Sequence, residues 1–163
     1  MGVMRNALLV LVSAATVVMT GAGPGAGASR VFGTVEPEAD LSHHGHVSLW
    51  GGELTLRVQT GNHGPSGLTD ATVRLVFSAP LLHDLSLPSA CLWGGERVVL
   101  CRTGHLRALG RGPEITVDLR TVGRPDEVVV RIDTAWSGGA SDRNPENHQH
   151  RVLVPETGDR YVF

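Results

Sequence analysis

The chain has 163 residues, of which 41% are hydrophobic and 18% charged, and its 14 basic and 16 acidic residues give a formal net charge of −2. This composition is that of one ordinary globular domain and argues against a disordered, highly charged tail protein. It excludes nucleic acid as a main partner, because a phosphate-binding surface needs a net positive field that this chain does not carry.

Residues 1–28 predict a cleavable secretory signal peptide. Arg5 supplies the positive start, residues 7–19 form an apolar run, and Ala26-Gly27-Ala28 has the small-x-small pattern of a cleavage site. The run is too short to span a membrane permanently. We therefore expect a secreted protein, extracellular or associated with the cell wall, that keeps no permanent membrane span after cleavage. An uncleaved N-terminal anchor is the alternative.

The two cysteines, Cys91 and Cys101, predict a structural disulfide. Exported proteins fold in an oxidising space, where cysteines at this separation pair with each other. Closing so short a loop stabilises the fold by about 3 kcal/mol in the chain-entropy account. Two reduced, buried thiols are the alternative.

From residue 40 onward, apolar and polar residues alternate in short segments separated by Gly, Pro and Asn. Such alternation is typical of strands with one face in a core and one face in water. About seven antiparallel strands in a domain of this length predict an all-β fold, a two-sheet β-sandwich of immunoglobulin-like type, with a closed barrel as the alternative. The expected strands are residues 41–50, 54–58, 71–77, 97–102, 115–119, 128–134 and 151–154.

These strands define the expected domain organisation. Residues 29–38 form a flexible leader, residues 39–154 form the sandwich, and residues 155–163 form a C-terminal tail. We expect the tail to lie on the surface of the sandwich, with Tyr161 and Phe163 able to dock there.

Several short signatures occur in an order that resembles a bacterial conserved-repeat domain of unknown function. They are Ala39-Asp40-Leu41, Asn62-His63-Gly64-Pro65-Ser66, Asp70-Ala71-Thr72-Val73, Val99-Leu100-Cys101, and the run Asp142-Arg143-Asn144-Pro145-Glu146-Asn147. The resemblance covers roughly residues 39–154. It implies an immunoglobulin-like sandwich of exported and cell-surface proteins that serves surface architecture or binding without catalysis. His148 stands where that family usually has a second Asn.

Two of these signatures predict structural turns. Asn62 can close an Asx turn, Gly64 allows a positive φ, and Pro65 fixes the reversal that follows. In the last loop Asp142, Asn144 and Asn147 can bond backbone amides and hold the final strand in register. Calcium at Asp142 and Asn144 is the alternative, although a single strong carboxylate is too few for a tight site.

Histidines at alternate positions suggest a metal site. His44 and His46 share one face of a strand, as do His148 and His150. Because the first and last strands of such a sandwich often lie next to each other, the two pairs could meet, and four imidazoles, or three with Asp40, suit Zn²⁺ or Cu²⁺. The alternative is that they are exposed polar positions on edge strands.

Three tryptophans, Trp50, Trp93 and Trp136, lie beside Gly or Ser and could form a carbohydrate-binding platform. Tryptophans at strand ends more commonly cover a core.

The sequence carries no signature of a nucleophile with its base or of a phosphate-binding loop. We therefore expect a secreted, non-catalytic envelope or extracellular interaction or structural module. Its partner would be a cell-wall polymer or an extracellular protein, and it would need no cofactor unless Zn²⁺ or Cu²⁺ binds. The alternatives are a carbohydrate- or metal-binding exoprotein and a small secreted hydrolase.

Overall fold

The computed structural model describes residues 36–163, which form an all-β sandwich of two antiparallel sheets without a helix. The expected signal peptide, residues 1–28, and most of the expected leader, residues 29–38, lie outside the described residues. Within residues 36–163 there is accordingly no helix that could cross a membrane.

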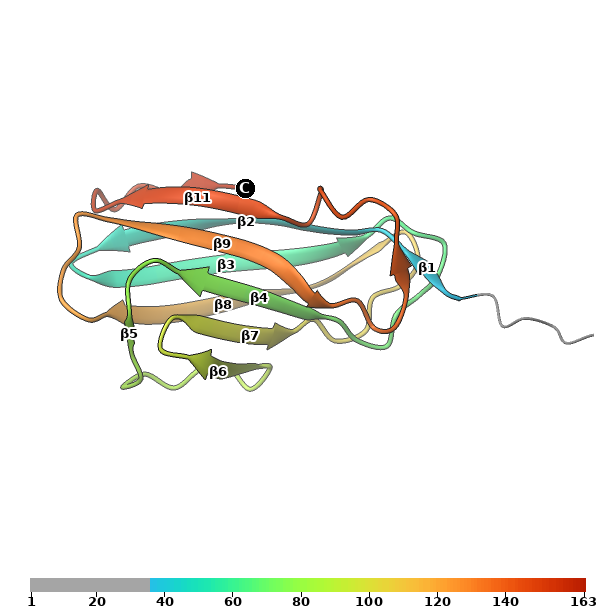
Figure 1. The fold of residues 1–163 in the computed structure, drawn as a ribbon, viewed down its shortest axis with the longest axis horizontal. Helices are drawn as coiled ribbons and strands as arrows, with labels where there is room; N and C mark the ends of the chain where they lie inside the picture. The colour runs from blue at the N-terminus through green and yellow to red at the C-terminus, as the bar shows by residue number, and fades with distance from the viewer. Residues whose placement is uncertain (1–35) are drawn as a thin grey trace, which may run out of the picture. The chain divides into compact units, whose positions relative to one another are not determined.

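Each sheet has five strands, and the two sheets form the front and back layers in Figure 1. The back sheet has the order β12-β2-β3-β8-β5, and the front sheet has the order β11-β9-β4-β7-β6. The strands of the back sheet are β2 (Leu41–Trp50), β3 (Glu53–Asn62), β5 (Leu81–Leu82), β8 (Gly110–Thr121) and β12 (Tyr161–Val162). The strands of the front sheet are β4 (Thr72–Phe77), β6 (Cys91–Gly95), β7 (Val98–Arg102), β9 (Glu127–Trp136) and β11 (His150–Pro155).

The alternating apolar residues form the core between the two sheets. Buried and more exposed residues alternate along most of each long strand, as the sequence pattern predicts, and the sandwich is confirmed. The rows that meet in this core include Leu54, Leu56 and Val58 from β3, Val73, Leu75 and Phe77 from β4, Val117 and Leu119 from β8, and Val128, Val130 and Ile132 from β9.

A smaller cluster closes one end of the sandwich. There β1 (Glu38–Ala39) pairs in parallel with β10 (Ser141–Asp142), so that Glu38, which we expected in the leader, already belongs to a strand. Ala39 and Leu41 pack with Leu68 and Leu106 beneath this pair. The start of the domain is thereby joined to the loop that precedes the last long strand.

The C-terminal residues, expected as a tail laid on the surface, are in part strand residues, while Tyr161 and Phe163 dock on the core as expected. Pro155 still belongs to β11, while Tyr161 and Val162 form β12 and pair with β2. The N–H and C=O of Phe163 both bond Gly45 at 3.1 Å, and its ring packs on the core. A run of only a few residues gives no periodicity from which this strand could be recognised.

A disulfide joins Cys91 of β6 to Cys101 of β7, as expected from the sequence. The two cysteines are directly opposite each other in the antiparallel pair. Cys101 is fully buried in the core, and Cys91 packs against it. The bond therefore ties the edge strand β6, which the alternation did not reveal, to the body of the sandwich.

Candidate functional site

His43 is a buried histidine that links the two sheets. It points inward from β2, and its Nδ1 lies 3.0 Å from the Thr60 hydroxyl of β3, in the same sheet. Its Nε2 lies 2.9 Å from the Thr134 hydroxyl of β9, in the opposite sheet. Burial, reinforced by the neighbouring imidazoles, lowers the pKa of His43 to about 3. A neutral ring with one donor and one acceptor nitrogen fits two hydroxyl partners.

Two further histidines lie beside His43. The His148 ring meets the His43 ring edge-on, with centroids 6.0 Å apart, and its Nε2 is 3.7 Å from the Asp142 carboxylate. The His150 ring lies 5.4 Å from the ring of Phe163. Burial lowers the pKa of His150, while hydrogen bonds to the main chain of His43 and Asn147 oppose that shift. Three imidazoles thus gather at the edge where β2 faces β9 and β11.

The two predicted histidine pairs lie on different sides of β2. His44 and His46 alternate with the inward-facing His43 and so lie on the outer face of the sheet. His150 is opposite the buried Ile132 and faces inward. Within residues 36–163, no group of three or more His, Cys, Asp or Glu side chains is placed to hold a metal ion. Binding of Zn²⁺ or Cu²⁺ by His44, His46, His148 and His150 stays a prediction.

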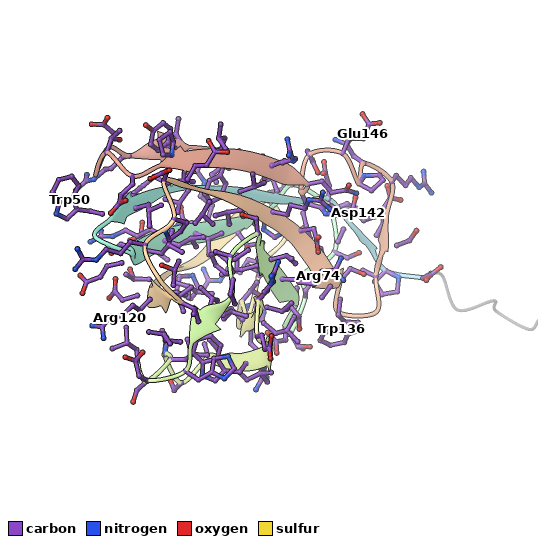
Figure 2. All side chains as sticks on the ribbon, turned by 60° about the vertical axis from the view of Figure 1, so that its left-hand side comes forward. Trp50, Arg74, Arg120, Trp136, Asp142 and Glu146 are labelled. Carbon is purple, nitrogen blue, oxygen red and sulfur yellow. A yellow bond between two sulfur atoms is a disulfide. The ribbon has the colours of Figure 1, made fainter. Side chains whose placement is uncertain are left out.

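The three tryptophans do not share one surface. Figure 2 shows Trp50 and Trp136 at opposite ends of the sandwich, and they are 68% and 50% exposed. Trp93 packs on the core from β6, and its ring stacks on that of His83 at a centroid distance of 4.0 Å. A platform that combines all three is therefore not formed, and each exposed tryptophan stands alone.

Asn62 holds the turn that follows β3, together with two neighbouring segments. Its Oδ1 accepts the N–H of Gly64 at 3.0 Å, which closes the Asx turn, and the N–H of Asp40 at 3.3 Å. Its Nδ2 donates to the carbonyl oxygens of Ser66 and Arg107. This fully buried amide thus binds four backbone groups and joins the turn to the start of β2 and to residue 107.

Gly64 has a different role from the one expected, because it is not among the glycines with positive φ. A Cβ at this position would lie 2.6 Å from the Cα of Ala39. Glycine is needed here because the backbone of residue 64 approaches the backbone of β1 closely at Ala39. Pro65 follows it at the exposed tip of the bend.

Of the three polar residues expected to bond backbone amides in the last loop, only Asp142 does so through its side chain. Asp142 accepts the N–H of Leu41 at 3.1 Å and that of Asn144 at 2.9 Å. Asn144 takes part through its backbone, and Asn147 donates from its side chain to the carboxylate of Asp40 at 2.6 Å. The expectation that Asn144 and Asn147 bond backbone amides through their side chains is therefore wrong. Asp142 alone does this.

A hollow of about 520 Å³ opens to solvent between the segment before β6 and the middle of β8. Its charged lining residues are Arg102 and Glu114. Arg102 is bonded to Asp70, and Glu114 lies 3.5 Å from Arg57. The Asp70 carboxylate also accepts the N–H groups of residues 71 and 104. The two charged side chains that line this hollow are therefore already paired with other residues.

Sequence reasoning did not identify His43, Asp70 and Thr103 as buried polar residues. The Thr103 hydroxyl bonds the N–H of Ala71 and the carbonyl of Gly104. For His43 a signal was present, because it shares the inward face of its strand with Leu41, Val47 and Leu49. A polar residue in an apolar row indicates a buried hydrogen-bonded group.

Comparisons with known proteins give no family for the chain. No family model matches it, and no curated protein matches it. Among solved structures it is similar to part of beta-glucosidase 3B from Thermotoga neapolitana in complex with alpha-D-glucose, at 15% identity and a TM-score of 0.42. The match covers 77% of this chain and 17% of that protein, and a likeness at this level carries no conclusion about activity.

Proposed function

We propose that this chain is a secreted, non-catalytic module that serves extracellular interaction or cell-envelope architecture, and that its sandwich is of the immunoglobulin-like type. The connections support this fold type. The chain passes from one sheet to the other between β3 and β4 and again between β8 and β9, as in Greek-key sandwiches. The disulfide supports export, since such bonds persist in oxidising compartments.

The proposal that the module is non-catalytic rests on one observation: its buried polar side chains are engaged in hydrogen bonds within the fold. His43 binds two threonine hydroxyls, Asn62 binds four backbone groups, and Asp70 binds two backbone amides and an arginine. Groups used in this way stabilise loops and sheet contacts. The exposed surface, which comprises the outer faces of the sheets and the two ends of the sandwich, then remains as the part that meets a partner.

The test is retention of the purified full chain on cell-wall material and on proteins of the culture medium. Specific, saturable retention on peptidoglycan, on a wall polysaccharide or on one medium protein supports the proposal. Trp50→Ala and Trp136→Ala are a matched pair of variants, because both residues are exposed and lie at opposite ends of the sandwich. Their separate effects on retention locate the binding end.

Turnover would contradict the proposal. The same preparation is incubated with chromogenic glycosides and esters, and release of product in proportion to the protein concentration would assign an enzyme. His43→Gln and Asn62→Ala then tell whether the activity needs the buried groups that we assign to structure.

A further inference from the structure

Both outer faces carry ion pairs, among them Arg74 with Asp133 at 2.8 Å on the front sheet, but the front sheet also carries exposed apolar side chains in a row. On the β12-β2-β3-β8-β5 sheet, charged groups are paired with one another. Arg57 lies 3.5 Å from Glu114, and Arg120 lies 3.4 Å from Glu53 and 2.8 Å from Asp84. A face of this kind is suited to contact with water.

The outer face of the other sheet carries an apolar stripe that crosses all five strands. Leu153 is directly opposite Val129, Val76 is opposite Val98, and Leu100 is opposite Leu92. Leu153 is 49% and Leu92 55% exposed. A continuous apolar patch on an outer surface marks a place where another surface binds. From β11 to β6, the stripe consists of Leu153, Val129, Val76, Val98, Leu100 and Leu92.

Two arginines lie beside this stripe without a carboxylate partner. Arg131 of β9 and Arg151 of β11 are directly opposite each other, an arrangement that costs stability because their charges repel. Neither forms an ion pair with any residue in 36–163. Together with Val76, Ser78 and Val129 they line a shallow hollow on this face.

Acidic residues occupy the other end of the same two strands. Glu127 begins β9, and Glu156 directly follows β11, where its N–H bonds the carbonyl of Asp126. Neither acid has an ion-pair partner in the described part of the chain. The apolar pair Val129 and Leu153 separates this acidic end from the basic end.

We propose that a second copy of this chain docks on this face, related to the first by a two-fold axis that lies in the interface, parallel to the sheet and perpendicular to its strands, at Val129 and Leu153. Such an axis reverses the strand direction. It therefore places Glu127, at the acidic end of each copy, over the basic end of the other copy and sets stripe against stripe. An anionic partner of another kind satisfies the arginines but leaves the acidic end unpaired, which favours a second copy.

The small size of the face indicates a weak dimer. Five strands about 4.8 Å apart, with about six residues each, give a projected area of roughly 400 to 500 Å². Standard protein interfaces bury about 800 Å² per partner, so that this face lies at the small end of the range. We therefore expect a dimer of micromolar affinity.

The test is sedimentation equilibrium of the purified full chain between about 1 and 300 μM, the range that brackets a micromolar dissociation constant. Arg131→Glu and Glu127→Arg should each weaken the dimer by about tenfold or more, and the variant that carries both changes should recover most of the loss. Leu153→Asp should abolish dimerisation. Arg111→Glu changes an exposed arginine on the other sheet and should leave the dissociation constant unchanged.

Each contrary result overturns the proposal. These results are a monomer at every concentration, a dimer that the two charge reversals do not weaken, a double variant that does not recover, and equal weakening by Arg111→Glu. A monomer that instead binds an anionic polymer through Arg131 assigns the face to a different partner. Circular dichroism confirms that each variant is folded. The proposed function is independent of this outcome, because retention on wall material is measured on its own.

Discussion

Replacement of His43 by leucine tests how the two sheets are held together at the edge formed by β2, β9 and β11. The change removes an imidazole that binds the hydroxyls of Thr60 and Thr134. Thr60 is buried, so that its hydroxyl loses a partner that water does not replace. A buried polar group left without a partner costs about 1 to 3 kcal/mol, and we expect a loss of about 2 to 4 kcal/mol in the free energy of unfolding at pH 7.

The same variant should change how stability depends on pH. Burial and the neighbouring imidazoles hold the pKa of His43 at about 3 in the folded protein, against 6.5 in an unfolded chain. Between these values the unfolded state binds a proton that the folded state does not, so that stability is complete above pH 6.5 and is lost as the pH falls toward 3. For one such group, the free energy of unfolding falls by about 2 kcal/mol between pH 7 and pH 5.

The assay is urea unfolding at pH 7, 6 and 5 with the disulfide intact, followed by tryptophan fluorescence. The difference in stability between the natural chain and His43→Leu should shrink by about 2 kcal/mol from pH 7 to pH 5. Part of the pH dependence should remain in the variant, because burial also lowers the pKa of His150. Thr134→Val is the matched control, since it removes one hydrogen bond but leaves the imidazole buried. Equal pH dependence in His43→Leu and the natural chain would refute the reasoning.

Three further changes test the turn after β3 and the disulfide. Asn62→Ala removes four hydrogen bonds to backbone groups and should cost about 3 kcal/mol or more in urea unfolding; a loss below about 1 kcal/mol would contradict this role. Gly64→Ala places a methyl group 2.6 Å from the Cα of Ala39 and should cost about 2 kcal/mol and speed amide exchange at residues 38–41, whereas unchanged exchange would argue against the close approach. Cys91→Ser with Cys101→Ser should lower stability by about 3 kcal/mol in the same assay, and an unaltered unfolding midpoint would show that the bond constrains little.

The long strands could be predicted because a strand that buries one face shows it directly in its sequence. The alternation at Leu54, Leu56 and Val58 and at Val128, Val130 and Ile132 corresponds to buried rows in opposite sheets. Short strands carry too few residues for such a pattern. The strand β6, with Gly94 and Gly95 among its five residues, and the two-residue strand β12 were therefore missed.

The candidate site was harder to predict because it depends on which residues face each other across the sandwich. The alternation correctly places His44 and His46 on one side of their strand, but it does not show that His43 meets His148 from a segment about a hundred residues away. The charge pattern of Arg131 and Arg151 depends on register between β9 and β11, which periodicity alone does not fix. The Asx turn at Asn62 is local and was predictable, whereas its bonds to Asp40 and Arg107 are not local.

Export is the claim on which the proposed function rests most directly, and fractionation of cells that express the full chain tests it. Mass spectrometry of the protein from medium, wall and cytoplasm gives the first residue and the state of Cys91 and Cys101. Our account predicts a chain that begins at Ser29, outside the cytoplasm, with the two cysteines joined. An intact chain that begins at Met1, retained in the cytoplasm with two free thiols, would contradict it.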